Sequence, residues 1–197
     1  MTAKSVQFWF EFASTYSYLS IMRIEERAAE AGFEIDWKPF PLGPIFKAQG
    51  WDNSPFNIYK AKGDYMWRDM ERLCAHRNLP FVTPDPFPQN SLSAARLALA
   101  AQDEPWFVDY CKGVYAAQFG AGKNIADPDT LSEIVLRAGA DPAHWLSRMG
   151  EDDVKQALKT RSAEAMELGI FGAPSFIVDG ELYWGDDRLD QALGAGG

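Results

Sequence analysis

The stretch that decides the fold is VQFWFEFASTYSY, residues 6–18. Val6–Phe12 is an apolar run typical of a buried strand, and small hydroxyl residues follow it at once. Apolar residues then recur at helical spacing as far as Ala31. A strand that turns directly into a helix places hydroxyl side chains beside the free backbone N–H groups of the helix N-terminus, where an anion is favoured. The corner at Ser14 is therefore the first candidate for a binding site.

The next residues complete a β-α-β unit. Gly32 predicts the end of the helix, and apolar residues alternate with charged ones over residues 33–38, which predicts a second strand. Two strands joined through a helix are expected to pair in parallel. Helices on both faces of such a sheet explain why the first strand is rich in aromatic residues.

Residues 42–168 show helical patterns and no strand pattern. A loop is expected through Gly43, Lys47 and Gly50, and the four prolines of Pro80–Pro88 exclude a regular helix there. Helices are expected to start at capping residues, several of which precede a proline. The expected starts are Ser54-Pro55, with a helix to Asn78 loosened near Gly63, then Ser91, Glu104-Pro105, Asp127-Pro128, Asp141-Pro142 and Glu151, the last helix running to Leu168.

Strand patterns return only near the end of the chain. Residues 175–184 predict a hairpin across Asp179-Gly180, and a terminal helix is expected from there to Leu193. The order is then β-α-β, a helical insertion and β-β-α, which is the thioredoxin arrangement once the insertion is removed. We therefore expect an α/β protein with a thioredoxin-like domain, residues 1–41 and 169–197, and an inserted all-helical domain, residues 42–168.

Composition narrows the classes of function. The chain of 197 residues has a net charge of −9 and no basic cluster, which argues against nucleic acid as a partner. No apolar run is long enough to span a membrane, and the first residues lack the features of a secretory signal, so a cytoplasmic location is expected. Cys74 and Cys111 form neither a CxxC motif nor a zinc pattern, so we expect buried free thiols in a reducing compartment. His76 and His144 are isolated and predict no metal site.

Each candidate feature also has an ordinary structural interpretation. Serine is a preferred N-cap, so Ser14 alone predicts a helix cap, and Thr15 or Ser17 can take that role equally well. Ala173-Pro174 alone is a loop proline before a strand, where most such bonds are trans. In a thioredoxin-type fold this bond is cis and lies against the first helix, which lets the backbone of Ala173 pair with an extended ligand.

Two further sets of residues flank the expected site. Trp184-Gly185-Asp186-Asp187 predicts either a helix start with acidic residues in its first turn or a receptor for charged ligand ends. In the second interpretation, backbone N–H groups bind a carboxylate and Asp186 or Asp187 accepts an ammonium group. Lys47, Asn57 and Lys62 follow the second strand and are ordinary surface residues unless the insertion folds over Ser14.

These motifs resemble those of the 2-hydroxychromene-2-carboxylate isomerases and the related kappa-class glutathione transferases, within the DsbA-like thioredoxin superfamily. The resemblance covers essentially the whole chain. It is carried by FEFASTYSYL at residues 10–19, GAPS at residues 172–175 and WGDDRL at residues 184–189. The sequence departs from the family pattern at Thr15, because the family commonly has proline directly after the serine.

The resemblance implies glutathione as cofactor, a homodimer, and a small aromatic carboxylate or electrophile as second substrate. For glutathione, the implied residues are Ser14 at the sulfur, Ala173 and Pro174 at the cysteinyl backbone, and Trp184, Gly185, Asp186 and Asp187 at the γ-glutamyl end. For the second substrate they are Lys47, Asn57 and Asn90.

The resemblance also implies an activity. We expect a glutathione-dependent cis–trans isomerase that acts on 2-hydroxychromene-2-carboxylate or a similar conjugated aromatic carboxylate by reversible thiolate addition, as in aromatic degradation. A kappa-like transferase, which conjugates electrophiles and consumes glutathione, is the first alternative. A non-catalytic glutathione- or peptide-binding module is the second. A thiol–disulfide oxidoreductase ranks lower, because the CxxC motif is missing.

Overall fold

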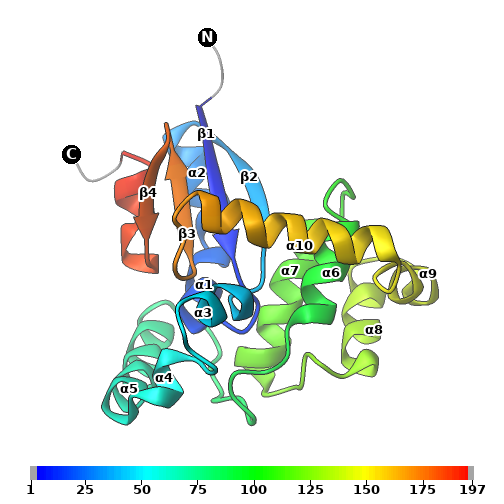
Figure 1. The fold of residues 1–197 in the computed structure, drawn as a ribbon, viewed down its shortest axis with the longest axis horizontal. Helices are drawn as coiled ribbons and strands as arrows, with labels where there is room; N and C mark the ends of the chain where they lie inside the picture. Colours follow the sequence, from blue (N-terminus) through cyan, green and yellow to red (C-terminus); the bar gives the residue numbers. More distant parts are fainter. Residues whose placement is uncertain (1–3, 195–197) are drawn as a thin grey trace.

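A four-stranded sheet, in the order β2-β1-β3-β4, organises the computed structural model, which describes residues 4–194. The strands are β1 (Lys4–Phe10), β2 (Phe33–Pro39), β3 (Ser175–Val178) and β4 (Glu181–Trp184). β1 and β2 are parallel, and β3 is antiparallel to both β1 and β4. The predicted order of β-α-β, helices and β-β-α is confirmed, and with it the thioredoxin-like fold (Figure 1).

The helix expected after β1 is in fact two helices, α1 (Thr15–Ile21) and α2 (Ile24–Ala31). The break falls at Arg23, whose φ of −131° is not helical. At this position the Arg23 guanidinium turns toward Asp186 and Asp190 and binds both. The predicted single helix was therefore wrong, and the contact that accompanies the break involves residues from the far end of the chain.

The segment between the two halves of the sheet is helical, as predicted, but its elements differ in detail. Its helices are α3 (Gly43–Ala48), α4 (Pro55–Ile58), α5 (Lys60–His76), α6 (Leu92–Ala100), α7 (Phe107–Tyr115) with a π-helical turn (Ala116–Gly120), α8 (Pro128–Arg137), α9 (Pro142–Arg148) and α10 (Asp152–Glu167). A short helix, α3, occupies the expected loop. No helix forms over Pro80–Pro88, in agreement with the prediction.

Gly63 was expected to loosen the helix that follows Ser54, but the break lies four residues earlier, at Tyr59. Gly63 instead lies inside α5 against the end of α4. A Cβ at this position would come within 2.2 Å of the Phe56 carbonyl oxygen. The glycine therefore allows the two helices to approach closely and does not interrupt either of them.

Capping residues behave as predicted at three helices and not at a fourth. The Ser54 hydroxyl accepts a hydrogen bond from the Phe56 N–H in α4. The carboxylates of Asp127 and Asp141 accept hydrogen bonds from the first turns of α8 and α9. Ser91 precedes α6, but its hydroxyl does not cap that helix, because it donates to the carboxylate of Glu11. The expected terminal helix is a 3-10 turn, Asp186–Arg188, followed by the short helix α11 (Leu189–Ala192).

Both faces of the sheet are covered. Phe8, Phe10 and Phe12 lie in a large apolar core shared with α1, α2 and the helices α5 to α8. Trp9 points to the opposite face, where it packs with Phe40 in a smaller core that also includes residues from α3 and the end of α10. Figure 1 shows α10 crossing in front of the strands.

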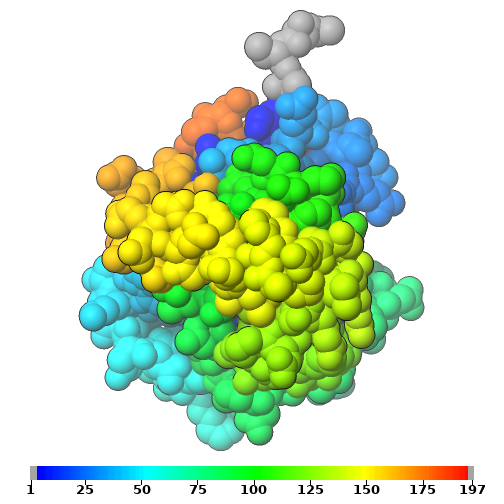
Figure 2. Space-filling model, turned by 90° about the vertical axis from the view of Figure 1, so that its right-hand side faces the viewer, coloured from blue at the N-terminus to red at the C-terminus, as the bar shows by residue number. Residues whose placement is uncertain are grey.

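The large core contains side chains from both parts of the chain that were expected to form separate domains. Figure 2 shows the green and yellow residues of the insertion as one continuous surface below the blue and orange residues of the two chain ends. The division into residues 1–41 with 169–197 and residues 42–168 stays a prediction. Over residues 4–194, none of the helices combines the length and the hydropathy needed to cross a membrane.

Candidate active site

Ser14 lies at the corner between β1 and α1, and its hydroxyl joins two distant parts of the chain. Its extended backbone, with φ −85° and ψ 120°, makes it the N-cap of α1. The Oγ atom accepts a hydrogen bond from the Ser17 N–H at 3.3 Å and donates one to the Ala173 carbonyl oxygen at 2.9 Å. The corner is thereby attached directly to the loop before β3.

The structure distinguishes between the three hydroxyls that the sequence left open. Thr15 is only 1% exposed, and its Oγ1 donates to the Sδ atom of Met66 in α5 at 3.3 Å. Ser17 is fully buried, and its contact with the corner is the hydrogen bond that its backbone N–H donates to Ser14. Ser14 alone of the three is partly exposed. Of these three hydroxyls, that of Ser14 is therefore the one that can meet a ligand at this corner.

The Ala173-Pro174 bond is cis, as expected for a thioredoxin-type fold. Ala173 accepts the hydrogen bond from Ser14, and no acceptor for its own N–H is found within residues 4–194. The Pro174 carbonyl accepts a hydrogen bond from the Gly185 N–H at 2.9 Å, which attaches the loop to the turn after β4. One edge of backbone beside Ser14 is therefore open to an extended ligand.

Trp184 forms an aromatic wall next to this loop. Its indole packs on Gly172, where a Cβ would lie 2.4 Å from Nε1. The ring centre of Phe171 lies 5.0 Å from that of Trp184, and both rings are about half exposed. The indole can pack this closely on the backbone because Gly172 has no side chain.

The two acidic residues of the turn have opposite environments. The side chain of Asp186 is 4% exposed and accepts hydrogen bonds from Ser20 and Arg77. The side chain of Asp187 is 74% exposed, and its nearest cation is the Arg188 guanidinium at 3.6 Å. Of the two carboxylates proposed to accept an ammonium group, only that of Asp187 is free to do so.

The three residues assigned to a second substrate are all exposed, and two of them already have partners. Asn57 in α4 donates to the Phe87 carbonyl oxygen at 2.9 Å and so ties α4 to the proline-rich loop. The side-chain oxygen of Asn90 accepts a hydrogen bond from the Leu92 N–H at 3.0 Å, at the start of α6. Lys47 lies on α3. Lys62 lies in α5, with its Nζ 5.6 Å from the centre of the Phe56 ring.

Glu11 is a buried acid close to the corner that the sequence analysis did not single out. It is 6% exposed, and its carboxylate accepts a hydrogen bond from the Ser91 hydroxyl. Burial raises the pKa of this carboxyl to about 7, against the opposing effects of the Ser91 hydroxyl and the Ala13 N–H. Its backbone carbonyl accepts hydrogen bonds from the Ser14 N–H and the Tyr115 hydroxyl. A charged residue within an apolar strand sequence was the signal that could have identified it.

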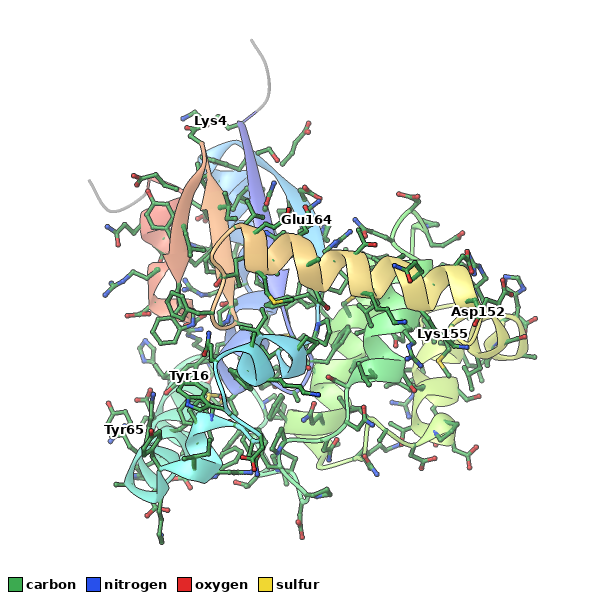
Figure 3. The ribbon with its side chains drawn as sticks, viewed as in Figure 1. Lys4, Tyr16, Tyr65, Asp152, Lys155 and Glu164 are labelled. Carbon is green, nitrogen blue, oxygen red and sulfur yellow. The ribbon has the colours of Figure 1, made fainter. Side chains whose placement is uncertain are left out.

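Tyr16 connects the same corner to the insertion. Its hydroxyl donates to Asp69 in α5 at 3.0 Å, and Figure 3 shows Tyr16 at the junction of α1 with α4 and α5. Burial and the adjacent Asp69 carboxylate raise the pKa of Tyr16 above its usual range. Helix α5 therefore contacts the first turn of α1 at both Thr15 and Tyr16.

The remaining metal-ligating and thiol side chains lie apart from this corner or are buried. Residues 4–194 contain no cluster of three or more histidine, cysteine or acidic side chains that could hold a metal ion. Cys74 and Cys111 are both buried and unpaired, as expected. Burial raises the pKa of the Cys74 thiol to about 11 and raises that of Cys111 as well.

Comparisons with known proteins agree with this geometry. The family model of the DSBA-like thioredoxin domain matches residues 5–195, and the chain belongs to that family. It is similar to a 2-hydroxychromene-2-carboxylate isomerase of Sphingobium xenophagum, with 28% identity over 194 residues and 95% of each chain covered. It is also similar to glutathione S-transferase kappa 2 of Caenorhabditis elegans, with 26% identity over 202 residues, 95% of this chain and 89% of that protein.

A solved structure of a 2-hydroxychromene-2-carboxylate isomerase superposes with a TM-score of 0.85 at 25% identity. The match covers 97% of this chain and 93% of the other. The resemblance inferred from the three motifs is therefore confirmed, and the similarity extends over the whole thioredoxin-like fold and its helical insertion.

Proposed function

We propose that this protein is a glutathione-dependent isomerase that acts on 2-hydroxychromene-2-carboxylate or a similar conjugated aromatic carboxylate. Relatives named as isomerases of this kind and as kappa-class glutathione transferases support glutathione-dependent isomerase or transferase chemistry in general. The single observation in the structure that carries the proposal is the contact between the Ser14 hydroxyl and the Ala173 carbonyl.

The backbone beside Ser14 fits the peptide part of glutathione. Ala173 offers an N–H without an acceptor in residues 4–194 and a carbonyl held only by a serine hydroxyl. These two groups match the C=O and N–H of a cysteinyl residue in strand-like pairing. When a ligand N–H donates to the Ala173 carbonyl, it replaces the hydrogen bond from Ser14. The Ser14 hydroxyl can then turn toward the sulfur of the ligand.

The turn after β4 fits the γ-glutamyl end. Within residues 4–194 no acceptor is found for the backbone N–H groups of Asp186 and Asp187, so both can bind a carboxylate. The exposed carboxylate of Asp187 accepts the ammonium group, and Trp184 forms the wall on one side. Gly185, with a φ of 109°, brings the backbone into this conformation.

Ser14 supplies the larger part of the thiolate stabilisation. When bound, glutathione supplies a thiolate nucleophile that adds reversibly to a conjugated carbon and is regenerated. A free cysteine thiol has a pKa of about 8.5, and lowering it by about two units requires about 2.7 kcal/mol. The dipole of α1 typically contributes about 0.3–1 kcal/mol, whereas a hydroxyl donating to a charged group contributes about 1.5–3 kcal/mol. The dipole alone falls short of this value, and the hydroxyl of Ser14 supplies the difference without forming a disulfide.

The second substrate is assigned to the insertion. Lys47 is the cation proposed to bind the substrate carboxylate, and the exposed amides of Asn57 and Asn90 lie at the edges of the proline-rich loop. Because both amides already hold backbone groups, we assign them a role in shaping this side of the site as well as in contacting the substrate.

The proposal extends to the assembly and location of the protein. We propose a homodimer, in keeping with the resemblance to this group. A cytoplasmic location is part of the same proposal, since both cysteines are free thiols and a reducing compartment keeps them so.

The experiment that tests the function is calorimetric titration with glutathione, followed by assays of isomerisation and conjugation. We expect binding by the wild-type protein and turnover of a hydroxychromene carboxylate without loss of glutathione. In Ser14→Ala, the pKa of the bound thiol should rise and the rate at neutral pH should fall by about tenfold or more. No binding at millimolar glutathione would exclude the proposed function.

A kappa-like transferase is the second candidate, because relatives named as glutathione S-transferase kappa cover 95% of this chain. The two functions use the same Ser14 hydroxyl and differ in the fate of glutathione. Stoichiometric loss of free glutathione with a stable conjugate would favour the transferase, and an unchanged glutathione concentration would favour the isomerase.

A further inference from the structure

We infer that Asp186 is a positioning residue whose buried ion pair with Arg77 holds the glutathione-binding turn in place and couples it to helix α5 of the insertion. The inference rests on the proposed function and deepens it, because it assigns the two adjacent carboxylates different tasks. Asp187 meets the ligand, whereas Asp186 acts through the backbone of its own turn.

The contacts of Asp186 show a buried carboxylate whose two oxygens both bind protein donors. Arg77 donates to both of its oxygens, with Nη2–Oδ2 at 2.6 Å and Nη1–Oδ1 at 3.1 Å. Ser20 donates to Oδ1 at 2.9 Å, and the Nε atom of Arg23 lies 3.4 Å from the same oxygen. A two-pronged arginine contact fixes orientation as well as distance. With 4% of its side chain exposed, Asp186 is an internal anchor.

The anchor joins the turn after β4 to residues 20–23 and to the end of α5, which are far apart in sequence. Ser20 belongs to α1, Arg23 lies at the break between α1 and α2, and Arg77 is the C-terminal cap of α5. Arg77 also points a guanidinium N–H at the Leu19 carbonyl oxygen, 3.4 Å away. The ends of α1 and α5 are thus held together by the same carboxylate that fixes the turn after β4.

The turn is held from two sides and leaves its remaining donors free. The Gly185 N–H binds the Pro174 carbonyl at 2.9 Å, and the Asp186 carbonyl accepts a hydrogen bond from Arg23 at 2.7 Å. The N–H groups of Asp186 and Asp187, for which residues 4–194 provide no acceptor, therefore have fixed positions before any ligand arrives. A receptor that is already ordered loses less conformational entropy on binding.

Helix α5 contacts both ends of the proposed site, the corner at Ser14 and the turn after β4. Near its middle, Met66 and Asp69 accept hydrogen bonds from the hydroxyls of Thr15 and Tyr16 at the corner. At its end it holds the turn through Arg77. Release of Arg77 should therefore loosen the γ-glutamyl receptor while the contacts beside Ser14 persist.

Two variants with two matched controls test this inference. Arg77→Gln and Asp186→Asn each remove the ion pair. Folding is expected to survive in both variants. In Asp186→Asn, Arg77 borders an open hollow of about 530 Å³ and stays hydrated. In Arg77→Gln, the Asp186 carboxylate keeps its contacts with Ser20 and Arg23. Arg68→Gln removes an arginine that is 67% exposed on the same helix. Asp190→Asn removes a carboxylate that binds Arg23 and Arg27 in the same cluster and has no side-chain contact with α5.

The readouts are calorimetric affinities for glutathione and for cysteinylglycine, which lacks the γ-glutamyl group. In both test variants the affinity for glutathione should fall by about tenfold or more, and that for cysteinylglycine should stay within about twofold. In turnover assays the KM for glutathione should rise while kcat at saturation changes little. Both controls should match the wild-type protein.

Hydrogen exchange provides a measurement that needs no ligand. In the unliganded test variants, exchange of the segment 184–188 should quicken, with no change in the controls. Unchanged exchange, or an equal loss of affinity for both thiols, would overturn the positioning role while leaving the proposed function intact. Absence of glutathione binding by the wild-type protein would instead overturn the proposed function and, with it, this role of Asp186.

Discussion

Replacing Glu11 by glutamine removes a buried carboxyl group and keeps an oxygen that can accept the hydrogen bond from Ser91. The pKa of Glu11 is raised from 4.5 to about 7, chiefly by burial, so the folded protein binds a proton in this range that the unfolded chain has released. The free energy of unfolding therefore falls as the pH rises from 4.5 toward 7. Glu11→Gln should remove this part of the pH dependence.

The size of this change in the free energy of unfolding follows from the interval between the two pKa values of Glu11, 4.5 and about 7. A difference of one bound proton changes the free energy of unfolding by about 1.4 kcal/mol per pH unit, which sums to about 3 kcal/mol between pH 4.5 and 7. Relative to the wild-type protein, Glu11→Gln should thus gain about 3 kcal/mol between pH 4.5 and pH 8. Urea unfolding at a series of pH values measures this difference directly.

Glu34→Gln is a suitable control, because Glu34 is an exposed glutamate on β2. It should show no comparable gain. A Glu11→Gln protein whose unfolding free energy parallels that of the wild-type at every pH would refute the reasoning. Such a result would mean that Glu11 stays charged in the folded protein, with its burial offset by the Ser91 and Ala13 hydrogen bonds.

Three further substitutions test other parts of the structure. Gly63→Ala places a Cβ 2.2 Å from the Phe56 carbonyl oxygen, a backbone atom, and should lower stability by roughly 2 kcal/mol or more in thermal unfolding. Thr15→Val removes the hydroxyl that binds Met66 and should leave the pKa of bound glutathione unchanged; a shift like that expected for Ser14→Ala would contradict the choice of hydroxyl. Asp127→Ala removes the N-cap of α8 and should cost about 1 kcal/mol in urea unfolding, and a loss below about 0.2 kcal/mol would show that the cap contributes nothing.

The elements that could be predicted from the sequence are those governed by nearby residues. Alternation over 33–38 and the hairpin signal at Asp179-Gly180 depend on neighbours in the chain, and the three strands that they predict formed as expected. Asp127 and Asp141 cap helices that begin one residue later. The candidate corner was found because Ser14 follows an apolar strand pattern in the sequence. Its partner Ala173 was found from its place before the hairpin of a thioredoxin-type arrangement.

What could not be predicted depends on contacts between distant residues. The break at Arg23 accompanies a contact with Asp186, 163 residues away, and no local pattern signals it. Ser91 looked like a cap because its sequence position suits one, yet its hydroxyl binds Glu11, 80 residues earlier. The choice between Asp186 and Asp187 likewise needed the fold, since two adjacent aspartates differ only in what surrounds them.

The burial of the two cysteines has a practical consequence for spectroscopy. Cys74 and Cys111 are at most 1% exposed, and burial raises the pKa of both thiols above the ordinary range. At neutral pH neither contributes thiolate absorbance in the ultraviolet. In a complex with glutathione, the thiolate signal near neutrality would therefore belong to the ligand alone, so its ionisation can be followed on the unmodified protein without replacing any cysteine.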